Sequence, residues 1–253
     1  MSRHYKIDGL ELPSVTTIIS DCTDKSGALT QWAANMVVEY IKGNIQPSMG
    51  MHDNEEDPYY KVAPYYEVFE VDLDKARMNF REVSKTALDI GSAVHQSIED
   101  YLMTGKDPQK TKEDDRILAG FIAFLEWMDD NHVEVIGVEE TVRGDFWAGT
   151  LDLLCNLNGV VYVIDFKTSK AIYPADMGPQ IAAYRSAYDR DEFMTIADVE
   201  GSAIIRLDKE TGEFEFKDFS KRYESDLNIF NRMVDLFFAR HPILARKAGY
   251  KED

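Results

Sequence analysis

Two aspartates and a lysine lie on either side of a tight-turn signal, where their side chains could do chemistry together. Asn158-Gly159 stands between two stretches rich in apolar and β-branched residues, 146–155 and 160–166, which is the strongest short signal for a two-residue hairpin turn. Such a turn pairs position 157 with 160 and so places Asp152 directly opposite Asp165 on one face of the sheet. Because like charges opposite each other destabilise a sheet, these carboxylates need a shared proton, a cation or a metal.

Lys167 adds a cation to this pair. It lies two residues beyond Asp165, so its side chain projects to the same face of the strand. Carboxylates suit a hard cation such as Mg²⁺. The ammonium could orient or help to deprotonate a water, or stabilise negative charge forming on a phosphate. The alternative is a buried salt bridge between Lys167 and Asp165 with a structural role only, and spacing alone leaves both interpretations open.

Two expected helices carry further polar side chains that could reach such a site. Glu99 follows His95 by one turn, so both could face a metal from one side of a helix. Gln180 and Tyr184 are also four residues apart on one helical face. Each has a structural alternative: a single helical histidine is often only hydrogen-bonded, Glu99 is most simply a solvated charge, and tyrosines in a stripe commonly pack in a core.

The hydrophobic spacing predicts the elements that must position these residues. It is helical before about residue 130 and largely alternating after it. We expect an extended start at 5–12 with a turn at Asp8-Gly9, leading through Pro13-Ser14 into the apolar stretch 15–19. Helices are expected at 25–42, 72–103 (in one or two pieces), 112–130, 177–188 and from 221 to 239 or beyond. Strands are expected at 133–142, 146–155, 160–166, 199–207 and 213–219. This order predicts an α/β (or α+β) fold with one central mixed β-sheet flanked by helices.

No linker-like stretch divides the chain, so we expect a single domain over 1–253. It would comprise a mainly helical N-terminal part (1–90), a catalytic core (91–220) and a C-terminal helix (221–253). Residues 43–66 break the helical pattern with two glycines, three prolines, four tyrosines and an acidic cluster. They are interpreted either as a solvated loop or as a flap over a site.

Composition excludes several classes of protein. The 46 Asp and Glu outnumber the 28 Lys and Arg, giving a net charge of −18. This argues against a nucleic-acid binder whose whole surface is basic, although a local basic channel remains open. Cys22 and Cys155 are too few for a disulfide framework, a Cys₄ zinc site or a Cys₄ iron–sulfur site within one chain. The apolar runs are shorter than the roughly 20 residues of a membrane span, and the N-terminus has no apolar core of a signal peptide.

Taken together, these residues resemble the RecB-type branch of the PD-(D/E)xK nuclease superfamily, which includes phage and bacterial recombination exonucleases. That branch has a helical His, then Gly-x-x-Asp, Asp-x-Lys and Gln-x-x-x-Tyr. The chain has them in this order, as His95, Gly149-Thr150-Leu151-Asp152, Asp165-Phe166-Lys167 and Gln180-Ile181-Ala182-Ala183-Tyr184. Leu151 stands where the Pro-Asp half-motif has proline. The resemblance runs from Pro13 to about Tyr188 and implies a restriction-endonuclease-like core.

The resemblance assigns roles in a metal site. Asp152, Asp165 and His95 would be metal ligands, joined by the backbone carbonyl of Phe166, and Lys167 would be the catalytic lysine. The cofactor implied is Mg²⁺ or Mn²⁺, as one or two ions.

The same resemblance gives other residues supporting roles. Gln180 and Tyr184 would orient the site or contact the DNA strand. Glu140, on the preceding strand, would support the ligands, and neighbouring Glu139 competes for that role because strand phase alone does not choose between them.

The activity implied is metal-dependent hydrolysis of DNA by an exonuclease of recombination, repair or phage DNA metabolism. A structure-specific or restriction-like endonuclease is an alternative, and so is a non-catalytic acidic DNA mimic or assembly protein on a nuclease scaffold. DNA is the expected partner. By analogy, a single-strand annealing or recombination protein is a further expected partner, and the chain could form a homo-oligomer. The expected location is the cytoplasm of a bacterium or phage-infected host, and no membrane is expected as a partner.

DNA would have to meet local basic residues. Lys170 and Arg185 fall near the expected site, beside Lys167. The last helical region holds four basic residues and no acidic ones between 236 and 251: Arg240, Arg246, Lys247 and Lys251. Alternatively, these basic side chains could only stabilise the helix, by interacting with the negative C-terminal end of its dipole. We expect DNA binding to be weak without metal and strongly dependent on salt.

Overall fold

The computed structural model of the chain describes residues 4–49, 67–105, 114–188 and 199–250. By their internal contacts the residues form two compact units, one of Met1–Asp24 with Asp89–Asp253 and one of Lys25–Leu88. The expected N-terminal part, 1–90, is thus shared between the two units, and residues 221–253 belong with the sheet.

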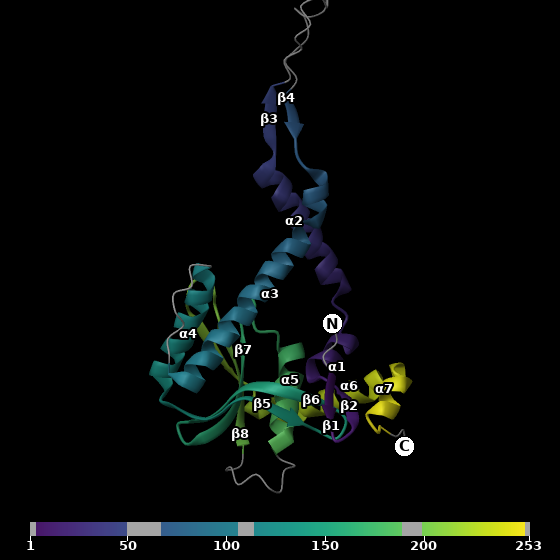
Figure 1. Cartoon of the computed structure of the whole chain (residues 1–253), viewed down its shortest axis with the longest axis vertical. Coiled ribbons are helices and arrows are strands. Elements are labelled where there is room, and N and C mark those ends of the chain that lie inside the picture. Colours follow the sequence, from purple (N-terminus) through teal and green to yellow (C-terminus); the bar gives the residue numbers. More distant parts are fainter. Residues whose placement is uncertain (1–3, 50–66, 106–113, 189–198, 251–253) are drawn as a thin grey trace, which may run out of the picture. The chain divides into compact units, whose positions relative to one another are not determined.

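A five-stranded mixed sheet is the centre of the first unit (Figure 1). Its strands are β5 (Val133–Arg143), β6 (Ala148–Leu157), β7 (Val160–Lys167), β8 (Val199–Leu207) and β9 (Phe214–Asp218), in that spatial order. β7 and β8 are parallel, whereas the other neighbours are antiparallel. All five expected strands are present, and the expected α/β class with one mixed sheet is confirmed.

The expected turn between β6 and β7 is confirmed. Leu157 pairs with Val160, and the two residues between them, Asn158 and Gly159, have φ angles of 56° and 88°. These left-handed angles are those of a type I′ turn, which Asn-Gly adopts at low cost.

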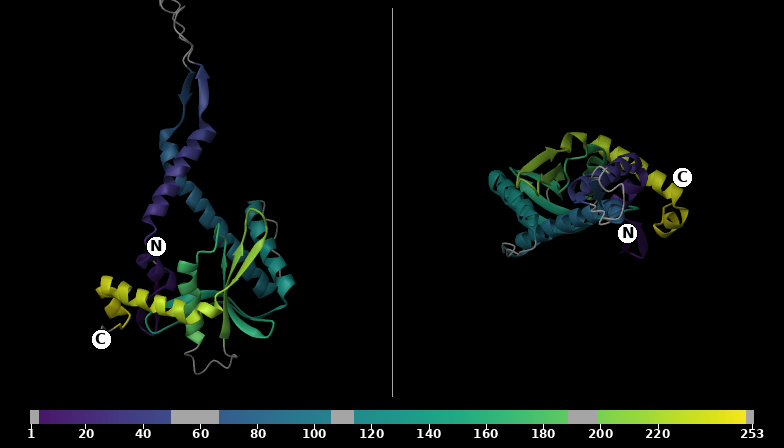
Figure 2. Two further views of the ribbon diagram at one scale, coloured as in Figure 1. Left: turned by 180° about the vertical axis from the view of Figure 1, so that it is seen from behind. Right: turned by 90° about the horizontal axis from the view of Figure 1, so that it is seen from above.

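Helices cover both faces of the sheet (Figures 1 and 2). One face packs against α1 (Val15–Cys22), α5 (Pro174–Tyr188) and α6 (Tyr223–Arg240). The other packs against α4 (Asp115–Asn131) and the C-terminal part of α3 (Leu73–Thr104). A 3₁₀ turn (Ser220–Arg222) precedes α6, and α7 (Pro242–Lys247) follows it. α3 is one continuous helix.

An N-terminal hairpin precedes α1. β1 (His4–Ile7) and β2 (Leu10–Pro13) pair antiparallel around Asp8-Gly9, as expected. The extended segment ends at Pro13, because the Ser14 hydroxyl accepts the Thr17 N–H and so caps the N-terminus of α1. The apolar stretch 15–19 is therefore helical.

The second unit contains α2 (Ser26–Asn44), the strand pair β3 (Gln46–Met49) and β4 (Glu67–Glu70), and the first part of α3. The Asn79 side-chain amide donates to the Met36 carbonyl oxygen and joins α3 to α2. Part of the expected irregular segment 43–66 is thus a strand, while residues 50–66 lie outside the described residues. Within the described part of the chain, no helix is both long and apolar enough to cross a membrane.

Candidate metal centre

The strands β6 and β7 separate where the candidate site begins. Their ladder runs in the expected register from Leu157–Val160 to Leu153–Ile164 and ends there. The next pair in this register would be Asp152 with Asp165, and this expected pairing is not formed. The Asp152 carboxylate instead accepts the Phe166 N–H at 2.6 Å from its Oδ2 atom. A side chain replaces the next ladder bond, which opens the sheet between the two acids.

The neighbouring strand β5 is irregular at the same level. Its register to β6 shifts at Ile136, where one extra residue forms a bulge. Glu139 has a φ of 52°, and the ladder passes from Val138–Leu153 to Glu140–Leu151, leaving out Glu139 and Asp152. A bulky residue in left-handed backbone is strained and frequently marks a functional site.

Three ligand-type side chains converge at this irregularity. His95, Glu139 and Asp152 each offer a ligand atom, and these atoms all lie within 4.8 Å of one another. The Nδ1 atom of His95 lies 3.5 Å from Oδ2 of Asp152. α3 delivers His95 because its neighbours Val94 and Ile98 are buried against the sheet. A helix and two strands therefore contribute one donor each.

Asp165 and Lys167 form a second group on β7. Asp165 is 3% exposed, and its Oδ2 atom forms an ion pair with the Lys167 ammonium. Its Oδ1 atom accepts from the side-chain amide of Gln180 at 2.8 Å, and the same amide nitrogen lies 3.2 Å from the Tyr184 hydroxyl. Gln180 and Tyr184 thus reach the site from α5, as the sequence predicts.

The protonation equilibria show how strongly these groups interact. Burial raises the pKa of Asp165 to about 6, despite the opposing attraction of Lys167, and Asp152 adds to this rise. Burial also disfavours the charged forms of Asp152 and Lys167, but the charged groups next to them have the larger combined effect on their pKa values. His95 and Lys167 hold the pKa of Asp152 below its usual value, and both carboxylates raise the pKa of Lys167.

The donor set suits a divalent cation. The carboxylates of Asp152 and Asp165 repel each other, and a cation would relieve this repulsion. One imidazole among carboxylate oxygens is compatible with Mg²⁺, and with Mn²⁺ still more because imidazole is the softer ligand. The residues present therefore fit Mg²⁺ or Mn²⁺, and His95, Glu139 and Asp152 would hold one ion. Asp165, also expected as a ligand, contacts Lys167 and Gln180 and is not among these three residues, so its ligand role stays a prediction.

Several expected site residues have other contacts. Glu140 accepts a hydrogen bond of 2.7 Å from the Tyr188 hydroxyl, so Glu139, not Glu140, is the glutamate that joins the ligand group. Glu99 accepts from the side chain of Gln96 and is not among the three converging residues. The Phe166 ring lies edge-on to His95 with 6.4 Å between ring centres; the expected ligand role of its carbonyl stays a prediction.

The basic residues expected to meet DNA are largely paired. The Arg185 guanidinium lies 4.0 Å from the centre of the Tyr223 ring. Arg240 pairs with Asp21, and Lys247 with Glu11. Lys251 lies outside the described residues, and Lys170 is exposed.

Comparison with known proteins adds no family to this description. No protein-family model matches the chain, and no curated protein matches it.

Proposed function

We propose that this protein is a metal-dependent deoxyribonuclease that hydrolyses phosphodiester bonds. The observation that carries the proposal is the convergence of His95, Glu139 and Asp152 beside a buried aspartate paired with Lys167. A structural salt bridge alone would not explain three further ligand-type side chains, one of them on strained backbone.

Each side chain has a role in this proposal. His95, Glu139 and Asp152 would hold Mg²⁺ or Mn²⁺, which supplies Lewis-acid polarisation of the phosphate and an acidified water. Lys167 would stabilise the negative charge that develops on the phosphate, or orient the attacking water. Asp165 keeps the Lys167 ammonium charged and in place, because its carboxylate contacts that ammonium directly.

The sequence resemblance favours an exonuclease of recombination, repair or phage DNA metabolism within this class. The same resemblance supports DNA as the partner, together with a single-strand annealing or recombination protein. It also supports a homo-oligomer and a location in the cytoplasm. The net charge of −18 fits an acidic DNA mimic as well, but a mimic has no need of converging metal donors.

The test is a cleavage assay on three DNAs: end-labelled linear duplex, end-labelled single strand and closed circle, each with Mg²⁺ or Mn²⁺. We expect the wild-type protein to degrade the linear DNAs and leave the circle intact, and Asp152→Asn to be inactive. Asp129→Asn, at an exposed position on α4, is the matched control and should cleave like the wild type.

Two other outcomes would change the conclusion. Cleavage of the circle would show an endonuclease. No metal-dependent cleavage above that of Asp152→Asn, together with no heat of Mn²⁺ binding in calorimetry, would overturn the nuclease proposal in favour of the acidic mimic.

A further inference from the structure

The ring of Tyr184 packs directly on the backbone of β6 at Gly149. A Cβ atom at Gly149 would lie 2.5 Å from Cε1 of Tyr184, closer than real Cβ atoms approach, and 3.3 Å from its Cδ1 and Cζ atoms. The Gly149 backbone is fixed by its pairing with Val142 on β5. Only glycine therefore leaves room for the Tyr184 ring in its present place.

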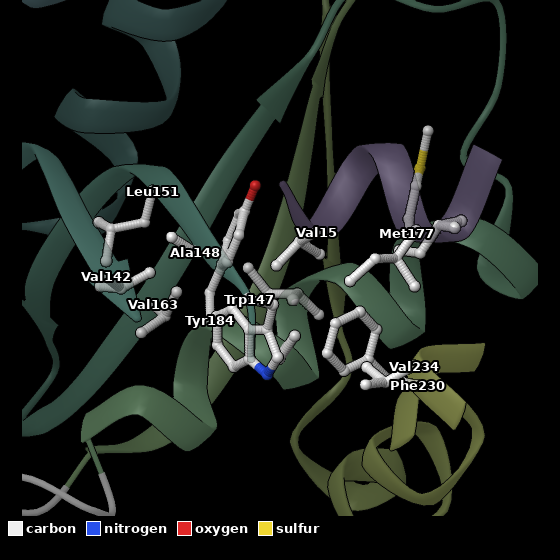
Figure 3. Packing of buried hydrophobic residues seen from close by; sticks show 14 of the residues in the cluster. Val15, Val142, Trp147, Ala148, Leu151, Val163, Met177, Tyr184, Phe230 and Val234 are labelled. Atoms are coloured by element: carbon white, nitrogen blue, oxygen red, sulfur yellow. The ribbon is translucent and has the colours of Figure 1, made fainter. Parts of the chain in front are cut away.

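The hydroxyl of Tyr184 lies beside the side-chain amide of Gln180. The ring is 4% exposed and belongs to the apolar cluster that includes Trp147 and Leu151. Figure 3 shows the ring among these residues, with its hydroxyl pointing away from Trp147. The side-chain nitrogen of Gln180 lies within hydrogen-bond distance of that hydroxyl and donates to Asp165.

We propose that Gly149 and Tyr184 are positioning residues that hold Asp165 in place through Gln180. The inference rests on the proposed function and deepens it. The sequence resemblance allowed Gln180 and Tyr184 either to orient the site or to contact DNA. Their burial, and the hydrogen bonds that engage both side chains, favour the orienting role. The Gly-x-x-Asp and Gln-x-x-x-Tyr elements then act as one unit, because the glycine of the first makes space for the tyrosine of the second.

The physical reason is the geometry of the Gln180 amide. Its nitrogen has two hydrogens, and the two acceptors, the Tyr184 hydroxyl and the Asp165 Oδ1 atom, take one each. With this nitrogen fixed, the other oxygen of Asp165 stays directed at Lys167. A methyl group at position 149 would push the ring and its hydroxyl away, and the amide would lose one of its two partners.

The chain offers a matched control for this contact. Gly201 on β8 lies beneath the ring of Tyr162, and a Cβ atom there would lie 2.3 Å from Cγ of that ring. Tyr162 donates its hydroxyl to Asp218 and takes no part in the metal centre. Gly201→Ala therefore creates the same glycine–tyrosine clash without disturbing Asp165.

We would measure cleavage rate and Mn²⁺ affinity in Gly149→Ala, Tyr184→Phe, Gln180→Leu and Gly201→Ala, each corrected for the folded fraction. Loss of one hydrogen bond predicts a rate about fivefold lower for Tyr184→Phe, and the displaced ring predicts at least that loss for Gly149→Ala. Gly201→Ala should match the wild type. Tyr184→Phe keeps the ring and serves as the test if Gly149→Ala does not fold.

A double variant separates positioning from general destabilisation. If Gly149 acts through Gln180, Gly149→Ala/Gln180→Leu cleaves no more slowly than Gln180→Leu alone, because coupled residues are not additive. Additive losses, or a wild-type rate in both Gly149→Ala and Tyr184→Phe, would overturn the inference.

A spectroscopic readout keeps the inference testable even if no cleavage is found. The side-chain amide signal of Gln180 in a ¹⁵N–¹H spectrum is identified by its loss in Gln180→Leu. It should shift in Gly149→Ala and Tyr184→Phe and stay in place in Gly201→Ala. Unchanged signals in all three would refute the positioning role, whatever the fate of the nuclease proposal.

Discussion

Two adjacent glutamates on β5 face different partners. Glu139 contributes a carboxylate to the group with His95 and Asp152, whereas Glu140 accepts the hydrogen bond of Tyr188. The two residues have the same charge, and only the local backbone separates their roles. This makes them a natural pair of variants for testing the candidate metal centre.

Glu139→Gln should lower Mn²⁺ affinity at least tenfold, because it replaces a charged ligand by a neutral one. Glu140→Gln should stay close to the wild type. Isothermal titration calorimetry measures both, and Mn²⁺ should bind more tightly than Mg²⁺ to the wild-type protein because of the imidazole ligand. Equal losses in the two variants would show that Glu139 is not a ligand.

The candidate metal centre should also respond to pH. Burial lowers the pKa of His95, but the Asp152 and Asp165 carboxylates outweigh it and raise the pKa above the usual 6.5. The proton on His95 thus stabilises the metal-free fold at low pH, and that stabilisation disappears as pH rises through the raised pKa. A metal ion binds only the neutral imidazole, so the affinity for metal must increase as the pH rises.

We therefore expect Mn²⁺ to raise the melting temperature more at about pH 8 than at about pH 6. His95→Gln should lose most of this difference, whereas His241→Gln, remote from the site beside Asp21, should keep it. Equal shifts at the two pH values in the wild-type protein would contradict a ligand role for His95.

At the scale of elements, the site depends on the close approach of α3 to the end of β7. Gly91 lies one turn before His95, and a Cβ atom there would lie 2.8 Å from Oγ1 of Thr168. Thr168 directly follows Lys167. The glycine therefore lets the helix deliver its histidine beside the strand that carries the lysine.

Gly91→Ala should weaken Mn²⁺ binding severalfold, since the new methyl group must displace Thr168 or the helix. Thr168→Ala removes the clashing oxygen, so the double variant Gly91→Ala/Thr168→Ala should recover most of the affinity. Calorimetry on the four proteins tests this. A double variant as weak as Gly91→Ala would show that the clash is not the cause.

The elements were largely predictable from sequence, and the details of the site were less so. Alternation and the Asn158-Gly159 turn predict β6, β7 and their register, and helical spacing places His95 on a helix. The end of the β6–β7 ladder depends on the Asp152 side chain replacing a backbone bond, which no local pattern encodes. The choice of Glu139 over Glu140 depends on the bulge at Ile136, which shifts the alternation counted from Val133.

At the scale of the whole molecule, the net charge of −18 would oppose the binding of the proposed DNA substrate. Several described basic residues that could offset it are engaged: Lys167 with Asp165, Arg240 with Asp21 and Lys247 with Glu11. Bound metal would remove part of the repulsion at the site. Affinity for DNA should therefore depend on metal as well as on salt.

Fluorescence anisotropy with a labelled DNA tests this dependence. In EDTA we expect weak binding, and in Ca²⁺, used to support binding without rapid turnover, tighter binding that falls at least about tenfold between 50 and 200 mM salt. Asp152→Asn should lose the Ca²⁺ effect. Tight, salt-insensitive binding in EDTA would contradict this account of the charge.

The left-handed backbone of Glu139 has a consequence for any attempt to engineer or evolve this protein. Glycine relieves such backbone by about 1–2 kcal/mol, so a screen for heat resistance alone should recover Glu139→Gly. We expect that variant to be more stable than Glu139→Ala in chemical unfolding, although both lack the carboxylate and bind Mn²⁺ poorly. Thermostability and metal binding would then require different residues at position 139. A library selected only for survival at high temperature would therefore lose the proposed metal-dependent activity.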